Sequence, residues 1–80
     1  MPKHLADRQI GIRAIEELYR VFPNLLDRTI AKRLGLDRKI LSAWKNGGTP
    51  SGFALQRMCW EGCDVIYILT GRRPKENDRR

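Results

Sequence analysis

Glycine and proline residues divide this sequence into short segments, and no other feature limits its fold as much. The breaks fall at Pro23, Gly35, residues 46–50, Gly62 and Gly71. A glycine readily takes the left-handed conformation that ends a helix, and a proline disfavours continuation of one. Because the segments carry apolar residues at helical spacing, the sequence predicts several short helices joined by tight turns.

Five segments show this spacing, and they cover residues 8–20, 26–34, 37–46, 52–61 and 65–69. Residues that can cap a first helical turn accompany them: Asp7, Asn24 or Asp27, Asp37, Ser51 and Asp64. The run 65–69 would also suit a strand, because its residues are β-branched, aromatic or Leu. A helix is preferred, since four helices precede it and no partner strand is visible. The prediction is an all-α, compact five-helix domain over residues 1–71, followed by a polar tail over 72–80.

The apolar repeats also predict which residues form the core. In the first two helices these are Ile10, Ala14, Ile15, Leu18, Tyr19, Phe22, Leu26, Ile30 and Leu34, and in the third Ile40, Leu41 and Trp44. In the fourth they are Phe53, Leu55, Met58 and Cys59. A chain of 80 residues has room for one small core of this kind, which is too little for most enzyme architectures.

Composition removes several classes of function. No apolar run approaches the roughly 20 residues of a membrane span, and the first residues lack the apolar stretch of a signal peptide, so we expect a cytoplasmic protein. Cys59 and Cys63 have poor spacing for a zinc site, and the only histidine, His4, lies far away in sequence. We interpret both cysteines as small apolar packing residues. No nucleophile–base pair or carboxylate dyad can be assembled, so we expect neither catalysis nor a cofactor, metal or small-molecule ligand.

The positive charge is concentrated in two parts of the chain. The net charge is +7, of which residues 26–47 carry +4 and the tail +3. On the third helix, burial of Ile40, Leu41 and Trp44 would turn the basic and small residues outward. A short exposed helix with long donors around small residues suits the major groove of DNA, although a solvated helix face has the same composition.

One spacing favours the DNA interpretation. Ala31, Gly35, Leu41 and Trp44 are separated by three, five and two residues, so that a small residue, a tight turn and two packing residues follow in the order a helix-turn-helix needs. The chain resembles the lambda-repressor-like family, specifically the N-terminal DNA-binding domain of phage CI-type repressors. The resemblance is carried by this spacing, by the segments 30–37 and 42–47 with Pro50, and by the segment 64–71 (Asp-Val-Ile-Tyr-Ile-Leu-Thr-Gly). The resemblance covers about residues 8 to 73.

The resemblance implies roles for individual residues. Residues matching base-reading positions are Arg38, Lys39, Ser42 and Ala43, and residues matching or neighbouring phosphate-contacting positions are Arg28, Lys32, Lys45 and Asn46. The implied function is a sequence-specific transcriptional regulator, most plainly a phage or prophage-type repressor that binds a palindromic operator in double-stranded DNA. Such repressors often carry a C-terminal domain after a linker, so the chain is either a free-standing regulator or part of a longer protein.

Binding to a palindrome requires a two-fold partner, so we expect a homodimer. The apolar run 65–69 exceeds what one helix of a small domain readily buries, and Trp60 adds apolar surface. Trp60, Ile66 and Tyr67 are therefore candidates for the dimer interface, with a place in the core as the other possibility. The main alternative function is a protein-interaction module, an antitoxin or antirepressor, that docks a protein through the fifth helix. RNA binding is less favoured, since the sequence does not alternate exposed basic residues with aromatic residues that could stack on nucleobases.

Overall fold

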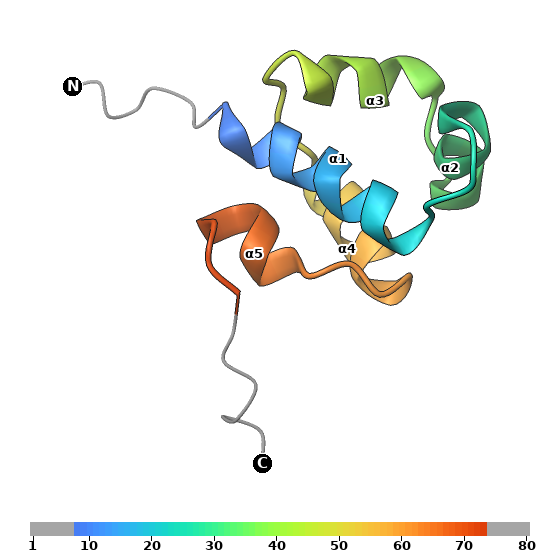
Figure 1. Cartoon of the computed structure of the whole chain (residues 1–80). Helices are drawn as coiled ribbons and strands as arrows, with labels where there is room; N and C mark the ends of the chain where they lie inside the picture. The colour runs from blue at the N-terminus through green and yellow to red at the C-terminus, as the bar shows by residue number, and fades with distance from the viewer. Residues whose placement is uncertain (1–7, 74–80) are drawn as a thin grey trace.

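The computed structural model describes residues 8–73, and within that range the chain folds into five helices with no strand. The helices are α1 (Gln9–Val21), α2 (Asp27–Leu34), α3 (Arg38–Lys45), α4 (Gly52–Trp60) and α5 (Val65–Thr70) (Figure 1). The all-α class and the five helices are confirmed for this part of the chain, and α5 excludes the strand alternative. None of these helices is long and apolar enough to cross a membrane. Asp7 and residues 74–80 of the predicted tail lie outside the described residues.

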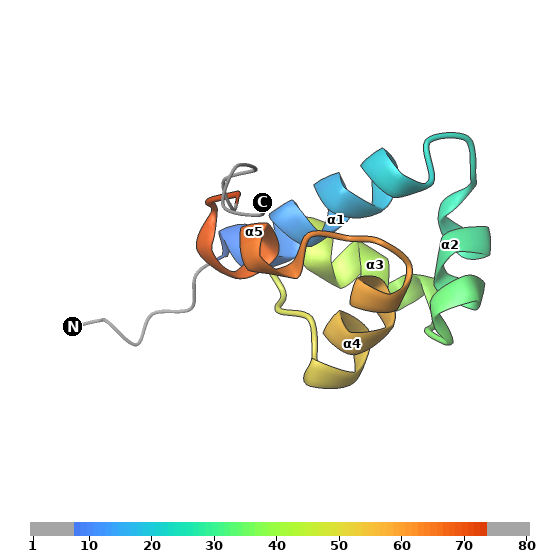
Figure 2. The same ribbon diagram turned by 90° about the horizontal axis from the view of Figure 1, so that it is seen from below.

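Helix α1 lies in the middle of the molecule. It packs against α3 on one side and against α5 on another, while α2 contacts both α3 and α4 (Figure 1). Seen from below, α4 lies at the edge of the molecule, where it also contacts α5 (Figure 2). The orientation of α3 relative to α5 is therefore set largely through α1.

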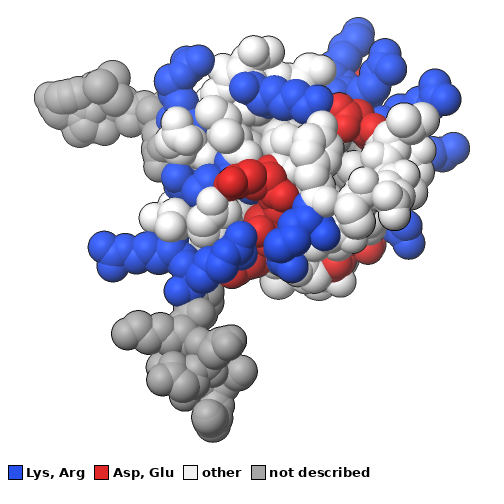
Figure 3. All heavy atoms as spheres, viewed as in Figure 1, with Lys and Arg blue, Asp and Glu red and all other residues white. Residues whose placement is uncertain are grey.

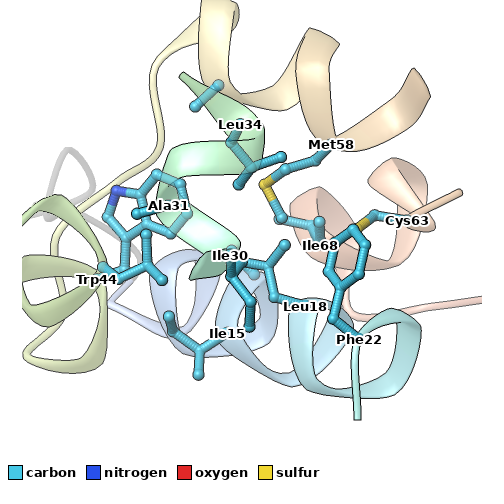
Figure 4. Close-up of a cluster of buried hydrophobic side chains, with 13 residues drawn as sticks. Ile15, Leu18, Phe22, Ile30, Ala31, Leu34, Trp44, Met58, Cys63 and Ile68 are labelled. Carbon is cyan, nitrogen blue, oxygen red and sulfur yellow. The ribbon is translucent and has the colours of Figure 1, made fainter. Parts of the chain in front are cut away.

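All five helices contribute side chains to one core (Figure 4). The large apolar residues with no exposed surface are Leu18, Ile30, Leu34, Leu41, Met58 and Ile68. Full burial of such a side chain contributes about 1.5–3 kcal/mol to folding. Since each helix supplies at least one of them, no helix can move away without opening the core.

Local signals set most of the helix ends. The side chains of Asp37, Ser51 and Asp64 accept hydrogen bonds from the backbone N–H groups two or three residues later, at 2.8, 3.1 and 2.9 Å, so these three predicted caps are confirmed. Gly35 and Gly71 end α2 and α5 with φ angles of 76° and 79°, in the left-handed region.

The predicted cap of α2 is wrong. Leu26 takes the N-cap position, Asp27 is already the first helical residue, and Asn24 lies in the preceding loop. The Asp27 carboxylate instead binds side chains from α1 and α3. A tertiary contact has thus replaced the local one that sequence reasoning expected.

Several residues predicted for the core lie at the surface. Tyr19, Leu26, Ile40 and Phe53 are exposed, as is Cys59, whereas Cys63 is buried as expected. The reason is geometrical: each helix of about two turns buries only a narrow stripe, such as Ala54 and Met58 in α4. Large apolar residues beside that stripe stay in solvent.

A buried carboxylate connects α1 to the C-terminal part of the fold. Glu17 has no exposed surface, and its oxygens accept hydrogen bonds from Arg20 (2.7 Å), from Arg73 (2.8 Å) and from the backbone N–H of Asp64 (2.8 Å). Burial by itself raises the pKa of this carboxyl group, but the hydrogen bonds from these three partners outweigh burial and lower the pKa to about 2. Glu17 is therefore charged at neutral pH and holds the start of α5 and the segment after it.

Candidate nucleic-acid interface

The α2–α3 pair has the tight geometry that its spacing predicts. After the left-handed Gly35, the backbone N–H of Leu36 donates to the carbonyl of Ala31 at 2.8 Å and closes the turn. Ala31 is almost completely buried, and its small side chain permits close packing in this corner. Leu41 and Trp44 are buried as well, so α3 is fixed against the core by one face along its whole length.

The C-terminal end of α3 is held by α1. A Cβ atom added to Gly11 would lie 1.9 Å from the Gly48 carbonyl oxygen, so the two backbones approach too closely for any other residue type. One Arg8 guanidinium nitrogen donates to the carbonyl of Asn46 at 2.9 Å, and the Gly48 N–H donates to the carbonyl of Ala43 at 2.8 Å. These contacts fix both the end of α3 and the loop after it.

The four residues predicted to read bases share the solvent-facing side of α3. Arg38, Lys39, Ser42 and Ala43 are all exposed. Basic side chains project from the part of the surface that α2 and α3 form (Figure 3). On this side of α3, two short side chains thus lie between long cationic ones.

The residues predicted to contact phosphate differ in what they already bind. Arg28 and Lys32 are exposed on α2, and neither side chain makes a hydrogen bond or ion pair with another residue in the range 8–73. The Asn46 amide is exposed and donates to the carbonyl of Ser42 at 3.0 Å. Lys45 is engaged, because its Nζ atom lies 2.6 Å from Asp27 Oδ2. The structure thus brings the predicted residues onto one surface but leaves them unequally available.

Sequence reasoning missed the cluster of Tyr19, Asp27 and Lys45. The Tyr19 hydroxyl donates to Asp27 Oδ1 at 2.8 Å, and the Lys45 ammonium lies 5.7 Å from the centre of the Tyr19 ring. The hydrogen bond from Lys45 and then that from Tyr19 lower the pKa of Asp27, and the bond to Asp27 raises the pKa of Lys45. No sequence signal joins these residues, which come from three different helices.

An open cleft of about 720 Å³ lies beside this cluster, between the end of α1 and the starts of α2 and α3. Its lining includes Tyr19, Asp27 and the arginines Arg28 and Arg38. One arginine from α2 and one from α3 therefore line a recess that also has one acid in its wall. Within residues 8–73, no group of three or more potential ligand side chains could hold a metal ion.

The predicted dimer residues lie away from this surface, on α4 and α5. Trp60 is 69% exposed and Ile66 is 55% exposed, and Leu69, three residues after Ile66 on α5, is exposed too. Tyr67 is half-buried, since its hydroxyl donates to Glu16 at 2.6 Å and Arg73 lies 4.0 Å from the centre of its ring. Trp60 and Ile66 are thus accessible to a partner, whereas Tyr67 is occupied within the chain.

Comparison with known proteins adds no family name. No protein-family model, no curated protein and no solved structure gives a significant match to this chain. The arguments about function therefore depend on the side chains that α2 and α3 present and on the way the fold holds them.

Proposed function

We propose that this protein is a sequence-specific DNA-binding regulator that inserts α3 into the major groove of double-stranded DNA. The observation that carries the proposal is the exposed face of α3, where Arg38 and Lys39 flank Ser42 and Ala43 on a helix fixed to the core by Leu41 and Trp44. The resemblance to the N-terminal domains of phage CI-type repressors points the same way.

The chemistry of this face matches what the major groove offers. An α-helix fits into the groove, and an arginine can donate two hydrogen bonds to O6 and N7 of guanine. Ser42 can donate to or accept from a base edge, and the Ala43 methyl group can contact the methyl group of thymine. A rigid helix favours such contacts, because little conformational entropy is lost when it binds.

The second helix supplies contacts that do not depend on sequence. Arg28 and Lys32 extend from α2 beside α3, where they can neutralise backbone phosphates and set the register of the protein on the duplex. Asn46 can donate to a phosphate from the end of α3. Such contacts release counterions, so we expect affinity to fall steeply with salt concentration.

A palindromic operator needs two copies of this domain. Trp60 and Ile66 present apolar side chains on α4 and α5, and such a patch can bury itself against the same patch of a second copy across a two-fold axis. Within this proposal the protein acts as a homodimer that represses transcription by covering a promoter.

The proposal is tested by selecting bound duplexes from a random pool and sequencing them. We expect a palindrome whose half-sites are about one helical turn of DNA apart. Arg38→Ala should cost about 1–3 kcal/mol in binding to the selected sequence and should relax the preference at one base pair per half-site. Arg72→Ala is the matched control, because it removes one exposed arginine that follows α5, outside α2 and α3, and it should leave the preference unchanged. Recovery of no preferred sequence would contradict the proposal.

A second function is favoured by the apolar surface of α4 and α5. Phe53 and Trp60 are more than half exposed, and Ile66 adds to this surface from α5, so a different protein could dock there. An antitoxin or antirepressor would use the fold in this way. A stable complex with a second protein, combined with equal affinity for all DNA sequences, would favour this function over the first.

A further inference from the structure

Asp27, the first residue of α2, lies within the proposed DNA-binding surface. Both oxygens of the Asp27 carboxylate are engaged by side chains, one by the Tyr19 hydroxyl at 2.8 Å and the other by the Lys45 ammonium at 2.6 Å. Tyr19 belongs to α1 and Lys45 to the last turn of α3. The carboxylate thus joins three helices at the edge of the cleft that Arg28 and Arg38 also line.

This placement affects any phosphate that approaches the surface. A phosphate that reaches Arg28 or Arg38 comes near the negative charge of Asp27 and is repelled by it. The Lys45 ammonium, which could bind that phosphate, is already paired with the Asp27 carboxylate and lies close to the Tyr19 ring. One of the cations predicted to contact DNA is therefore unavailable until the ion pair opens.

We propose that Asp27 competes with the DNA phosphates for Lys45 and so lowers the affinity of this surface for duplexes of every sequence. The inference rests on the proposed DNA-binding function and adds a residue that adjusts it. Since Asp27 acts on phosphate contacts, it reduces non-specific binding and leaves discrimination between sequences to the exposed face of α3. The operator and the competing sites of a genome are then weakened by the same factor, so the ratio of the two affinities is unchanged.

The test measures how tightly the wild type and Asp27→Asn bind the selected duplex and a shuffled duplex, at several salt concentrations. We expect Asp27→Asn to bind both duplexes about three- to tenfold more tightly, as expected for one ion pair near a surface. The slope of log affinity against log salt should steepen by about one, because Lys45 becomes free to neutralise one more phosphate. Circular dichroism and melting curves verify that each variant is folded.

Two further variants separate this role from a simple change in charge. Glu16→Gln removes one exposed negative charge from α1, where Glu16 accepts a hydrogen bond from the Tyr67 hydroxyl and pairs with no cation of α2 or α3, and it should leave both affinities nearly unchanged. In a Lys45→Met background, Asp27→Asn should gain clearly less than in the wild type.

The outcomes distinguish this inference from the function on which it rests. If the wild type prefers one sequence but Asp27→Asn gains nothing, or gains no more than Glu16→Gln, the inference is wrong and the proposed function stands. An equal gain in the Lys45→Met background also overturns it, because Asp27 then does not act through Lys45. If neither the wild type nor Asp27→Asn binds any duplex even at low salt, both proposals are wrong.

Discussion

Replacement of Glu17 by glutamine tests the link between α1 and the C-terminal part of the fold. Glu17 is fully buried, and the hydrogen bonds from Arg20, Arg73 and the Asp64 N–H lower its pKa from 4.5 to about 2 against the effect of burial. A shift of this size corresponds to about 3 kcal/mol of stability at neutral pH. A domain of this length typically has about 4–12 kcal/mol in total, so the loss should be large.

The sign of the pH dependence follows from the lowered pKa. The charged form of Glu17 is favoured by folding, so its contribution is fully present above pH 4.5 and is lost as the pH falls toward 2. Glutamine does not titrate. We expect Glu17→Gln to be about 2–3 kcal/mol less stable than the wild type at pH 7, with the difference shrinking toward pH 2.

The measurement is urea denaturation followed by far-ultraviolet circular dichroism between pH 7 and pH 2. Glu16→Gln is the matched control, because Glu16 is an exposed neighbour on α1 that accepts a hydrogen bond from the Tyr67 hydroxyl. Its removal should cost less than about 1 kcal/mol. Equal stability of Glu17→Gln and the wild type at pH 7, or a difference that does not change with pH, would refute the reasoning.

A pair of glycine substitutions and the reactivity of the two cysteines test the packing elsewhere in the domain. Gly11→Ala should cost about 1–3 kcal/mol in urea denaturation, because its Cβ meets the Gly48 carbonyl oxygen, whereas Gly52→Ala, with nothing within 4 Å of the new atom, should be neutral or slightly stabilising. In the native protein at pH 8, Cys59 should react with a disulfide reagent while Cys63 reacts at least roughly a hundredfold more slowly, because burial raises the pKa of the Cys63 thiol to about 12. Equal reaction rates, or equal losses from both glycine variants, would contradict these expectations.

The helix pattern was predictable because its signals are local. Asp37, Ser51 and Asp64 each lie within three residues of the N–H group that they cap, and Gly35 and Gly71 supply their own backbone conformation. All predicted helix ends agree with the structure to within one residue. The exposed face of α3 was predictable for the same reason, since burial of Leu41 and Trp44 fixes the rotation of that helix.

The remaining features depend on contacts between distant residues, and no local pattern shows them. Glu17 resembles any acid on an exposed helix until Arg73, 56 residues later, packs beside it. Asp27 resembles a helix cap, and only the packed structure shows that Lys45, 18 residues later, binds it. The close approach of Gly11 to Gly48 likewise arises only once α1 and α3 have packed.

Helix α1 connects α3, which is proposed to bind DNA, to α5, which is proposed to take part in the dimer. Gly11 and the preceding Arg8 contact the end of α3 and the loop after it. On the side of α5, Arg13 donates hydrogen bonds to the carbonyls of Ile68 (2.9 Å) and Leu69 (3.4 Å). In a dimer formed through α4 and α5, the distance between the two α3 helices would be set by these contacts. Because two half-sites must be matched at once, a loosened contact between α1 and α5 should weaken operator binding even though no residue that touches DNA has changed.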